Sequence, residues 1–226
     1  MYEKFGQFID GNWSPSTDKG TYEVINPATE EILGHASKAT SADVDKALKS
    51  AEKGLQIWKK TTPWDRSYIL RRIADKLREK KDLLAKWMTL ENGKPLAEGV
   101  GETNGAADIF EWNAEETKRI FGQTIESRFE DTRVHVYYQP VGVVAALSPW
   151  NFPLILAARK ISTALAAGCS VIIKPDTITP GVVMELVDIC RECGVPPGAV
   201  NLLSGDPPSI ASQLIQSDIV KKISVT

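Results

Sequence analysis

Cysteine and histidine are both scarce in this sequence. Its 226 residues include three cysteines, Cys169, Cys190 and Cys193, and two histidines, His35 and His135. So few cysteines, odd in number, exclude a disulfide framework and favour a reducing compartment, so we expect a cytoplasmic protein. The Cys190 and Cys193 pair has no second pair and no histidine nearby, and the two histidines lie far apart in the sequence. The sequence therefore predicts two partly buried thiols at Cys190 and Cys193, and neither a metal site nor a histidine-based catalytic triad.

An excess of charge and a long apolar run are also missing. Lys and Arg number 27 and Asp and Glu number 29, so no overall field attracts nucleic acid or an anionic membrane. The longest apolar segment, residues 153–167, contains Arg159 and Lys160 and is shorter than the roughly 20 residues that span a bilayer. The first 25 residues lack the layout of a signal peptide. We therefore expect no nucleic-acid or membrane partner, and any binding must come from a local site.

The composition is that of an ordinary globular protein, with 42% hydrophobic and 25% charged residues. Residues 1–35 predict short strands and turns, including a hairpin over residues 8–13 that we expect to cover the core rather than join it. Capping signals at Thr40 and at Thr62-Pro63 each precede an apolar-periodic segment. The patterns predict one helix after Thr40, a long helix up to Gly93, and a third over residues 95–122.

The second half of the chain alternates between strands and helices. Residues 133–139 alternate apolar and polar side chains, which predicts a strand that faces solvent or a partner. Further strands are predicted over residues 141–147, 171–173, 199–203 and 222–225, and helices over residues 153–167, 180–193 and 208–216. Strands separated by helices pair in parallel, so the fold class is α/β with an open, doubly wound parallel sheet.

Such a sheet binds ligands beyond the carboxyl ends of its strands. There the sequence places residues 148–151, 174–177 and 204–208. Asn151 is positioned to donate to a developing oxyanion, or to cap the helix that begins at Pro153. Lys174 is positioned to meet ribose hydroxyls or phosphate, or to lie in solvent at the strand end.

A glycine-rich phosphate loop is not found at these strand ends. The nearest pattern, Gly99, Gly101 and Gly105, lacks the dinucleotide spacing and lies within a helical segment. We expect these glycines to serve helix packing. If a dinucleotide binds, its pyrophosphate is therefore not held by a glycine-rich turn.

Several motifs resemble those of the aldehyde dehydrogenase superfamily, and the likeness extends over essentially the whole chain. They are Asn-Pro-Ala-Thr (26–29), Ser-Pro-Trp-Asn-Phe-Pro (148–153), Ala-Ala-Gly-Cys (166–169), Ile-Ile-Lys-Pro (172–175) and Gly-Val-Pro-Pro-Gly (194–198). Residues 88–98 and 111–122 look like the succinate-semialdehyde dehydrogenase group and its ketoglutarate-semialdehyde relatives. The resemblance implies a Rossmann-like cofactor domain, NADP or NAD as cofactor, and a short aldehyde with a distal carboxylate as substrate.

The resemblance also implies a role for individual residues. Asn151 corresponds to the oxyanion donor, and Arg159 to a ligand of the substrate carboxylate, with a surface arginine paired to a nearby acid as its alternative. Thr177 stands where members that prefer NAD carry Glu, so we expect NADP to be accepted. The residues expected at the cofactor are Ser148, Pro149, Trp150, Asn151, Lys174, Asp176, Thr177, Pro207, Pro208, Val225 and Thr226.

In the family, a cysteine thiolate attacks the aldehyde, hydride passes to the nicotinamide and a glutamate activates water. The resemblance places the nucleophilic cysteine and this glutamate later in the family's sequence than the position of Thr226. Cys169 corresponds to a structural position of the family, after Ala-Ala-Gly, and not to the nucleophile. We therefore expect an N-terminal part that lacks the catalytic domain and is inactive alone. Its expected parts are residues 1–132 (hairpin and helices of the cofactor domain), 133–140 (oligomerisation strand) and 141–226 (Rossmann-like). A homo-oligomer, either dimer or tetramer, is implied for the full-length protein. The alternative function is a non-catalytic nucleotide-binding or oligomerisation module.

Overall fold

A six-stranded sheet forms the centre of the protein in the computed structural model, which describes residues 2–226. In spatial order its strands are β10 (Val220–Val225), β7 (Val143–Leu147), β8 (Ser170–Lys174), β9 (Val200–Leu202), β1 (Gln7–Ile9) and β2 (Asn12–Ser14). The first four are parallel, and β1 and β2 are antiparallel to their neighbours. The near-continuous apolar sequences of β7 and β8 follow from burial of both sheet faces.

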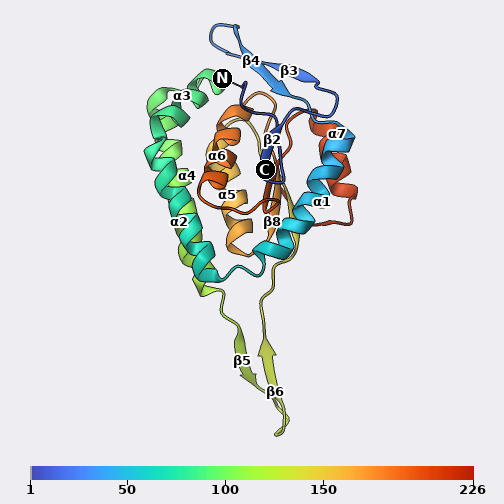
Figure 1. Cartoon of the computed structure of the whole chain (residues 1–226). Helices are drawn as coiled ribbons and strands as arrows, with labels where there is room; N and C mark the ends of the chain where they lie inside the picture. Colours follow the sequence, from blue (N-terminus) through green and yellow to red (C-terminus); the bar gives the residue numbers. More distant parts are fainter. Residues whose placement is uncertain (1) are drawn as a thin grey trace.

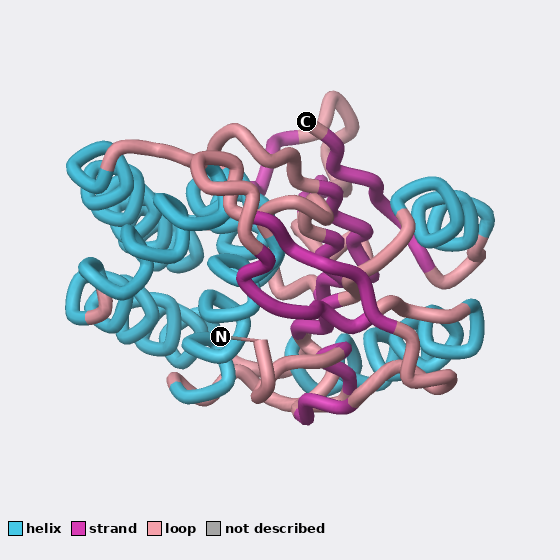
Figure 2. Tube along the Cα trace, turned by 90° about the horizontal axis from the view of Figure 1, so that it is seen from above, coloured by secondary structure: helices cyan, strands magenta, loops and turns pink. Residues whose placement is uncertain are grey.

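Helices cover the sheet on both sides, as the view along the sheet shows (Figure 2). Alternate residues of β7 separate two cores, with Val143 packed on one side and Val144 on the other. One side carries α1 (Ser41–Trp58) and α7 (Pro207–Gln216), and the other carries α5 (Pro153–Ala166) and α6 (Pro180–Glu192). An outer layer of α2 (Pro63–Glu79), α3 (Lys81–Asn92) and α4 (Leu96–Glu116) packs on α5 and α6. The predicted α/β class with a doubly wound parallel sheet is confirmed.

The order of the strands defines where ligands can approach. The chain moves from β7 to β8 to β9 on one side of β7, and then returns to place β10 on the other side. This reversal lies between β7 and β10, and in open α/β sheets ligands bind outside the carboxyl ends at such a reversal. We therefore expect a ligand site at the carboxyl ends of β7, β8 and β10.

The predicted capping signals hold, but the predicted long helix is wrong. Thr40 and Asp43 form a capping box at α1, and Thr62 caps α2 with Pro63 in its first turn. The segment up to Gly93 is two helices, because Lys80 leaves the helical conformation (φ −89°, ψ 13°). The apolar stripe continues through both helices, since α2 and α3 each face the same inner layer, and periodicity did not reveal the break. Helix α4 also ends before Gly122, and is followed by the 3-10 turn Thr117–Arg119 and by β5 (Gln123–Glu126).

The hairpin at residues 8–13 forms as predicted, with both turn residues at positive φ (Asp10 53°, Gly11 80°). The expectation that it lies outside the core is wrong. Phe8 pairs with Leu202 of β9, and the Phe8 side chain is 3% exposed. Strand β9 would otherwise have an open edge, so the hairpin completes the main sheet.

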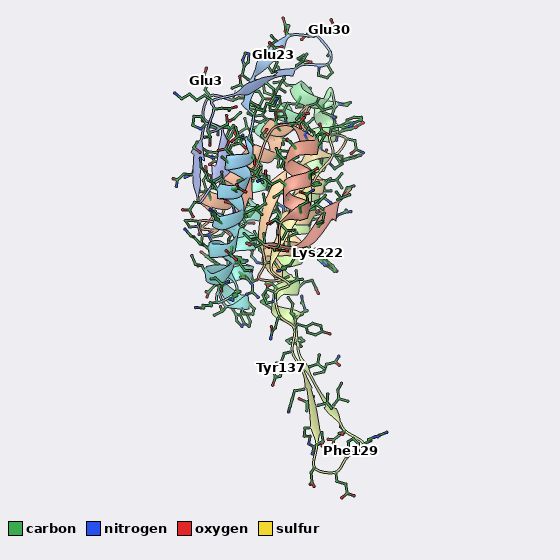
Figure 3. All side chains as sticks on the ribbon, turned by 90° about the vertical axis from the view of Figure 1, so that its right-hand side faces the viewer. Glu3, Glu23, Glu30, Phe129, Tyr137 and Lys222 are labelled. Carbon is green, nitrogen blue, oxygen red and sulfur yellow. The ribbon has the colours of Figure 1, made fainter. Side chains whose placement is uncertain are left out.

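Two further hairpins extend from opposite ends of the body (Figure 1). Strands β3 (Thr21–Ile25) and β4 (Ile32–Ser37) form one, and β5 and β6 (Arg133–Val136) form the other. The β5–β6 hairpin reaches far from the rest of the chain, with Phe129 near its tip and Tyr137 near its base (Figure 3). Both side chains are exposed, as are Ile125 and Val134. The strand predicted over residues 133–139 is thus present over its first four residues. Among residues 2–226, none of the helices is long and apolar enough to span a membrane.

Candidate active site

The parallel strands bring the three predicted segments to one edge of the sheet. The Ser148 amide donates to the Lys174 carbonyl over 3.1 Å, and the Leu203 amide donates to the Ile173 carbonyl over 3.0 Å. On the other side, Val225 of β10 is in register with Leu147 of β7. The ends of β7, β8, β9 and β10 are therefore adjacent, as a shared ligand site requires.

Lys174 does not lie in solvent, which was one of its two predicted environments. Its residue exposure is 4%, and its ammonium group takes part in no hydrogen bond or ion pair among residues 2–226. Burial lowers the pKa of Lys174, and the nearby Asp176 and Asp206 carboxylates oppose that shift. The buried Ser148 hydroxyl also lacks a partner within the described chain. A lysine whose ammonium has no partner in residues 2–226 and a buried hydroxyl without a partner match the hydroxyls and phosphates of a nucleotide.

The loop after β8, residues 175–179 (the β8–α6 loop), leads into α6, whose first turn is held by a carboxylate of α3. Glu91 accepts the amides of Gly181 (2.7 Å) and Val182 (3.3 Å) in the first turn of α6. The Tyr2 hydroxyl donates to the same carboxylate. Complete burial raises the pKa of Glu91 to about 7, although these three hydrogen bonds act in the opposite direction. Thr179, which precedes α6, has a buried hydroxyl with no partner in residues 2–226.

The loop after β7, residues 148–152 (the β7–α5 loop), carries Asn151 on its exposed side. The predicted alternative that Asn151 caps α5 is wrong, because the cap position belongs to Phe152 and no side chain of the loop caps the helix. Instead, the Glu102 carboxylate of α4 accepts hydrogen bonds from the first-turn amides of Leu154 (2.9 Å) and Ile155 (3.1 Å). The Asn151 amide has no partner among residues 2–226 and is therefore free to bind a ligand.

The backbone of the same loop is held by the segment between α3 and α4. The Lys94 ammonium donates to the Asn151 carbonyl over 3.1 Å and forms a buried ion pair with Glu102. It also lies 4.0 Å from the centre of the Phe152 ring. The Asn92 amide donates to the Trp150 carbonyl over 3.0 Å. Sequence reasoning used residues 88–98 only as a family marker, so Asn92 and Lys94 were not identified as functional residues.

The segment after β9 is the third of the predicted segments at this edge of the sheet. Asp206 caps α7 by accepting the Ser209 amide over 3.1 Å, and hydrogen bonding to Ser209 lowers the pKa of Asp206. The expected cofactor residues Pro207 and Pro208 are exposed in the first turn of this helix. Tyr22 of β3 shares a 2.6 Å hydrogen bond with Ser204, a contact that its position far away in the sequence gave no reason to expect.

Arg159 lies two turns along α5 from the β7–α5 loop, on the exposed side of the helix. It borders a cavity of about 250 Å³ together with Lys160, Lys222 and Ser224. The predicted alternative, a pairing with a neighbouring acid, is wrong because no ion pair involves Arg159 among residues 2–226. Lys160 donates to Ser224 (3.3 Å) and Thr226 (2.6 Å), which ties α5 to the end of β10. The arginine is thus free to bind an anion.

Comparisons with known proteins identify relatives in sequence and in fold. A protein from Pseudomonas putida called glutarate-semialdehyde dehydrogenase is 41% identical over 97% of this chain, which covers 46% of that protein. The NADP-dependent succinate-semialdehyde dehydrogenase of Escherichia coli is 39% identical over 96% of this chain and 45% of its own length. The crystal structure of succinate-semialdehyde dehydrogenase from Burkholderia pseudomallei superposes with a TM-score of 0.97 at 39% identity, over 98% of this chain and 46% of that one.

The chain therefore spans less than half the length of these relatives. The family model described as "Aldehyde dehydrogenase family" matches residues 13–226, which is nearly the whole sequence. The chain belongs to the aldehyde dehydrogenase family.

Proposed function

We propose that the carboxyl edge of the sheet is the cofactor and substrate face of an oxidoreductase that converts a short carboxylated aldehyde into its acid with NADP or NAD. The observation that carries this proposal is the Lys174 side chain, 4% exposed and with no partner for its ammonium in residues 2–226, together with the buried, unpartnered Ser148 hydroxyl at the end of the neighbouring strand. A cation at the end of a parallel strand and a buried hydroxyl without a partner are groups that a nucleotide can satisfy. The names of the relatives, succinate- and glutarate-semialdehyde dehydrogenase, support the substrate class.

The cofactor, when bound, supplies the hydride acceptor. In this proposal Lys174 binds the adenosine ribose, and the edge formed by Ser148, Pro207 and Thr226 surrounds the rest of the nucleotide. Thr177 brings no carboxylate to the place where a 2′-phosphate would approach, so we propose that NADP is accepted. Asp176, next to it, is half-buried and accepts the Ile178 amide over 3.2 Å, which keeps this carboxylate directed back into its own loop.

On the substrate side, Asn151 donates its side-chain amide to the aldehyde oxygen as negative charge develops there. A donor fixed in advance stabilises the charged transition state more than the neutral carbonyl, and so raises the rate. Arg159 binds the distal carboxylate of the substrate, because a guanidinium makes two parallel hydrogen bonds to a carboxylate. Of these two residues, Arg159 would discriminate a semialdehyde from a neutral aldehyde, because both substrates present the carbonyl oxygen that Asn151 binds.

A second candidate, a nucleotide-binding module without catalysis, is favoured by the positions of the cysteines. Cys169, Cys190 and Cys193 are all buried, and burial raises the pKa of Cys190 and Cys193, which disfavours the thiolate. In this second candidate, residues 2–226 would bind the cofactor without supplying a nucleophile.

An assay of two proteins separates these functions: the 226-residue chain, and the longest product of its gene. Each is incubated with succinate semialdehyde and NADP or NAD, and formation of reduced nicotinamide is followed by absorbance. We expect turnover only where a nucleophile-bearing segment is present, with cofactor binding in both. Absence of turnover in a longer product that binds cofactor would favour the non-catalytic module.

The β5–β6 hairpin is proposed as an oligomerisation element, because its large apolar side chains are exposed and far from the core. A hairpin without a partner is marginally stable in water, so a second copy of the protein would bury Phe129 and Tyr137. Light scattering is expected to show a dimer or tetramer in the longest gene product. A monomer at all concentrations would contradict this role.

A further inference from the structure

We propose that Lys94 and Glu102 form a positioning pair that fixes the β7–α5 loop, so that the Asn151 amide is held at one place. The proposal deepens the proposed function and rests on the role of Asn151 as oxyanion donor. Neither residue reaches the exposed side of the loop, so both act through Asn151 and are positioning residues rather than catalytic ones.

The contacts surround Asn151 in the chain. Before it, the Trp150 carbonyl accepts from Asn92, and at Asn151 itself the carbonyl accepts from Lys94. After it, Glu102 accepts the amides of Leu154 and Ile155. The backbone on both sides of the Asn151 side chain is thus fixed by groups from the α3 to α4 segment.

Burial makes this arrangement specific. The side chains of Lys94 and Glu102 are 6% and 1% exposed, and each satisfies the other's charge. Removing one charge leaves the other buried and unpaired, which is the reason the two residues must act together. An exposed lysine at the same distance would be mobile and would fix nothing.

The consequence for the reaction follows from how oxyanion donors work. Such a donor lowers the barrier only if it is already directed at the developing charge, and a displacement of about 1 Å costs roughly 10²-fold in rate. Loosening the loop should therefore reduce kcat and leave KM for the cofactor nearly unchanged, because Lys174 lies on another segment, at the end of β8.

The first test needs no activity and uses the 226-residue chain. Hydrogen exchange is measured by mass spectrometry for Lys94→Met, Glu102→Gln and the milder Asn92→Ala. We expect exchange at residues 149–155 to rise by about tenfold in the first two and less in the third, with α6 unchanged. Lys86→Met, an exposed lysine on α3, is the matched control and should change nothing. Unchanged exchange at residues 149–155 in Lys94→Met and Glu102→Gln overturns the proposal.

The second test is a double-mutant cycle in the longest product of the gene that turns over aldehyde. Lys94→Met is expected to lower kcat by about 10-fold or more in the presence of Asn151, and hardly at all in Asn151→Ala. An equal loss in both backgrounds contradicts a role through Asn151. If Asn151→Ala itself leaves kcat unchanged while exchange at residues 149–155 still rises, the oxyanion role is wrong and the positioning of the loop stands.

Discussion

The loops after β7 and β8 meet the same structural need in two different ways. Each leads into a helix whose first turn lacks a side-chain cap of its own, and each receives a carboxylate from the outer helices. Under the β7–α5 loop the carboxylate is Glu102, which is paired with the Lys94 ammonium. Under the β8–α6 loop it is Glu91, whose partner is the neutral Tyr2 hydroxyl.

The difference shows which loop is supported by a group that titrates near neutrality. Under the β8–α6 loop, burial raises the pKa of Glu91 to about 7, so this carboxyl exchanges its proton near neutrality. In the proposed function the first loop carries the group that acts on the reacting atoms, and the second carries groups for the cofactor. The charged pair thus lies under the loop where geometry matters most.

The largest expected effect is on the first loop. In an active product of the gene, Asn151→Ala should lower kcat by about 10²–10³-fold, because one oxyanion donor is lost. Steady-state kinetics with succinate semialdehyde measures this, and Asn104→Ala, an exposed asparagine on α4, serves as the control. An unchanged kcat would remove the distinction between the two loops.

The second loop is expected to respond to pH. The pKa of Glu91 is about 7 in the folded chain and 4.5 is its ordinary value, so folding binds a proton between these two pH values. This contribution to stability is fully present below pH 4.5 and is lost as the pH rises to about 7. The loss is about 3 kcal/mol at 1.36 kcal/mol per pKa unit.

Urea unfolding of the 226-residue chain between pH 4.5 and 8 checks this, with Glu91→Gln for comparison. The variant should lack this loss. Asp43 provides a control of opposite sign. Burial would raise its pKa, but hydrogen bonds from Thr17 and Thr40 overcome that and lower the pKa to about 2, so its contribution is lost only in acid. Parallel pH profiles for the wild-type chain and Glu91→Gln would show that the two loops are held alike.

The exposed side of α5 that carries Arg159 gives the next prediction. Arg159→Ala should lower kcat/KM for succinate semialdehyde by about 10²-fold and leave kcat/KM for butanal nearly unchanged. Only succinate semialdehyde has a carboxylate, so only this substrate loses a charged hydrogen-bonding partner in the variant. The competing aldehydes are assayed side by side, with Arg72→Ala, an exposed arginine on α2, as a matched control. Equal losses for both aldehydes would assign Arg159 to structure.

The smallest expected effect concerns the choice of cofactor at the second loop. Thr177→Glu should shift preference toward NAD by roughly tenfold, because a carboxylate there repels a 2′-phosphate. Paired titrations with NADP and NAD measure the ratio, and Thr177→Ser should leave it unchanged. A strong NAD preference in the wild-type chain would contradict the proposed role of Thr177.

The parts of the fold that follow local rules could be predicted from the sequence. Strand β8 and helices α5 and α6 lie within two residues of their predicted ends, because apolar runs, an initial proline and a final glycine mark them. The break at Lys80 and the place of β1 in the main sheet could not be predicted. Both depend on packing against distant segments, which leaves no local pattern.

The candidate site divides in the same way. Asn151, Lys174 and Arg159 could be chosen because they follow strand ends or interrupt an apolar helix. Glu102 lies 52 residues from the amide of Leu154 that it accepts, and Tyr2 lies 89 residues from Glu91. Contacts over such separations are set by the packing of α3 and α4, so the support of each loop was visible only in three dimensions.

Lys174 is the central ligand in the proposed cofactor site, and calorimetric titration of the 226-residue chain with NADP tests this role directly. We expect binding to the wild-type chain, at least tenfold weaker binding to Lys174→Ala, and no change in Lys59→Ala, an exposed lysine at the end of α1 near the opposite edge of the sheet. Equal affinity of the wild-type chain and Lys174→Ala, or no binding to the folded wild-type chain, would contradict the assignment of this edge to the cofactor.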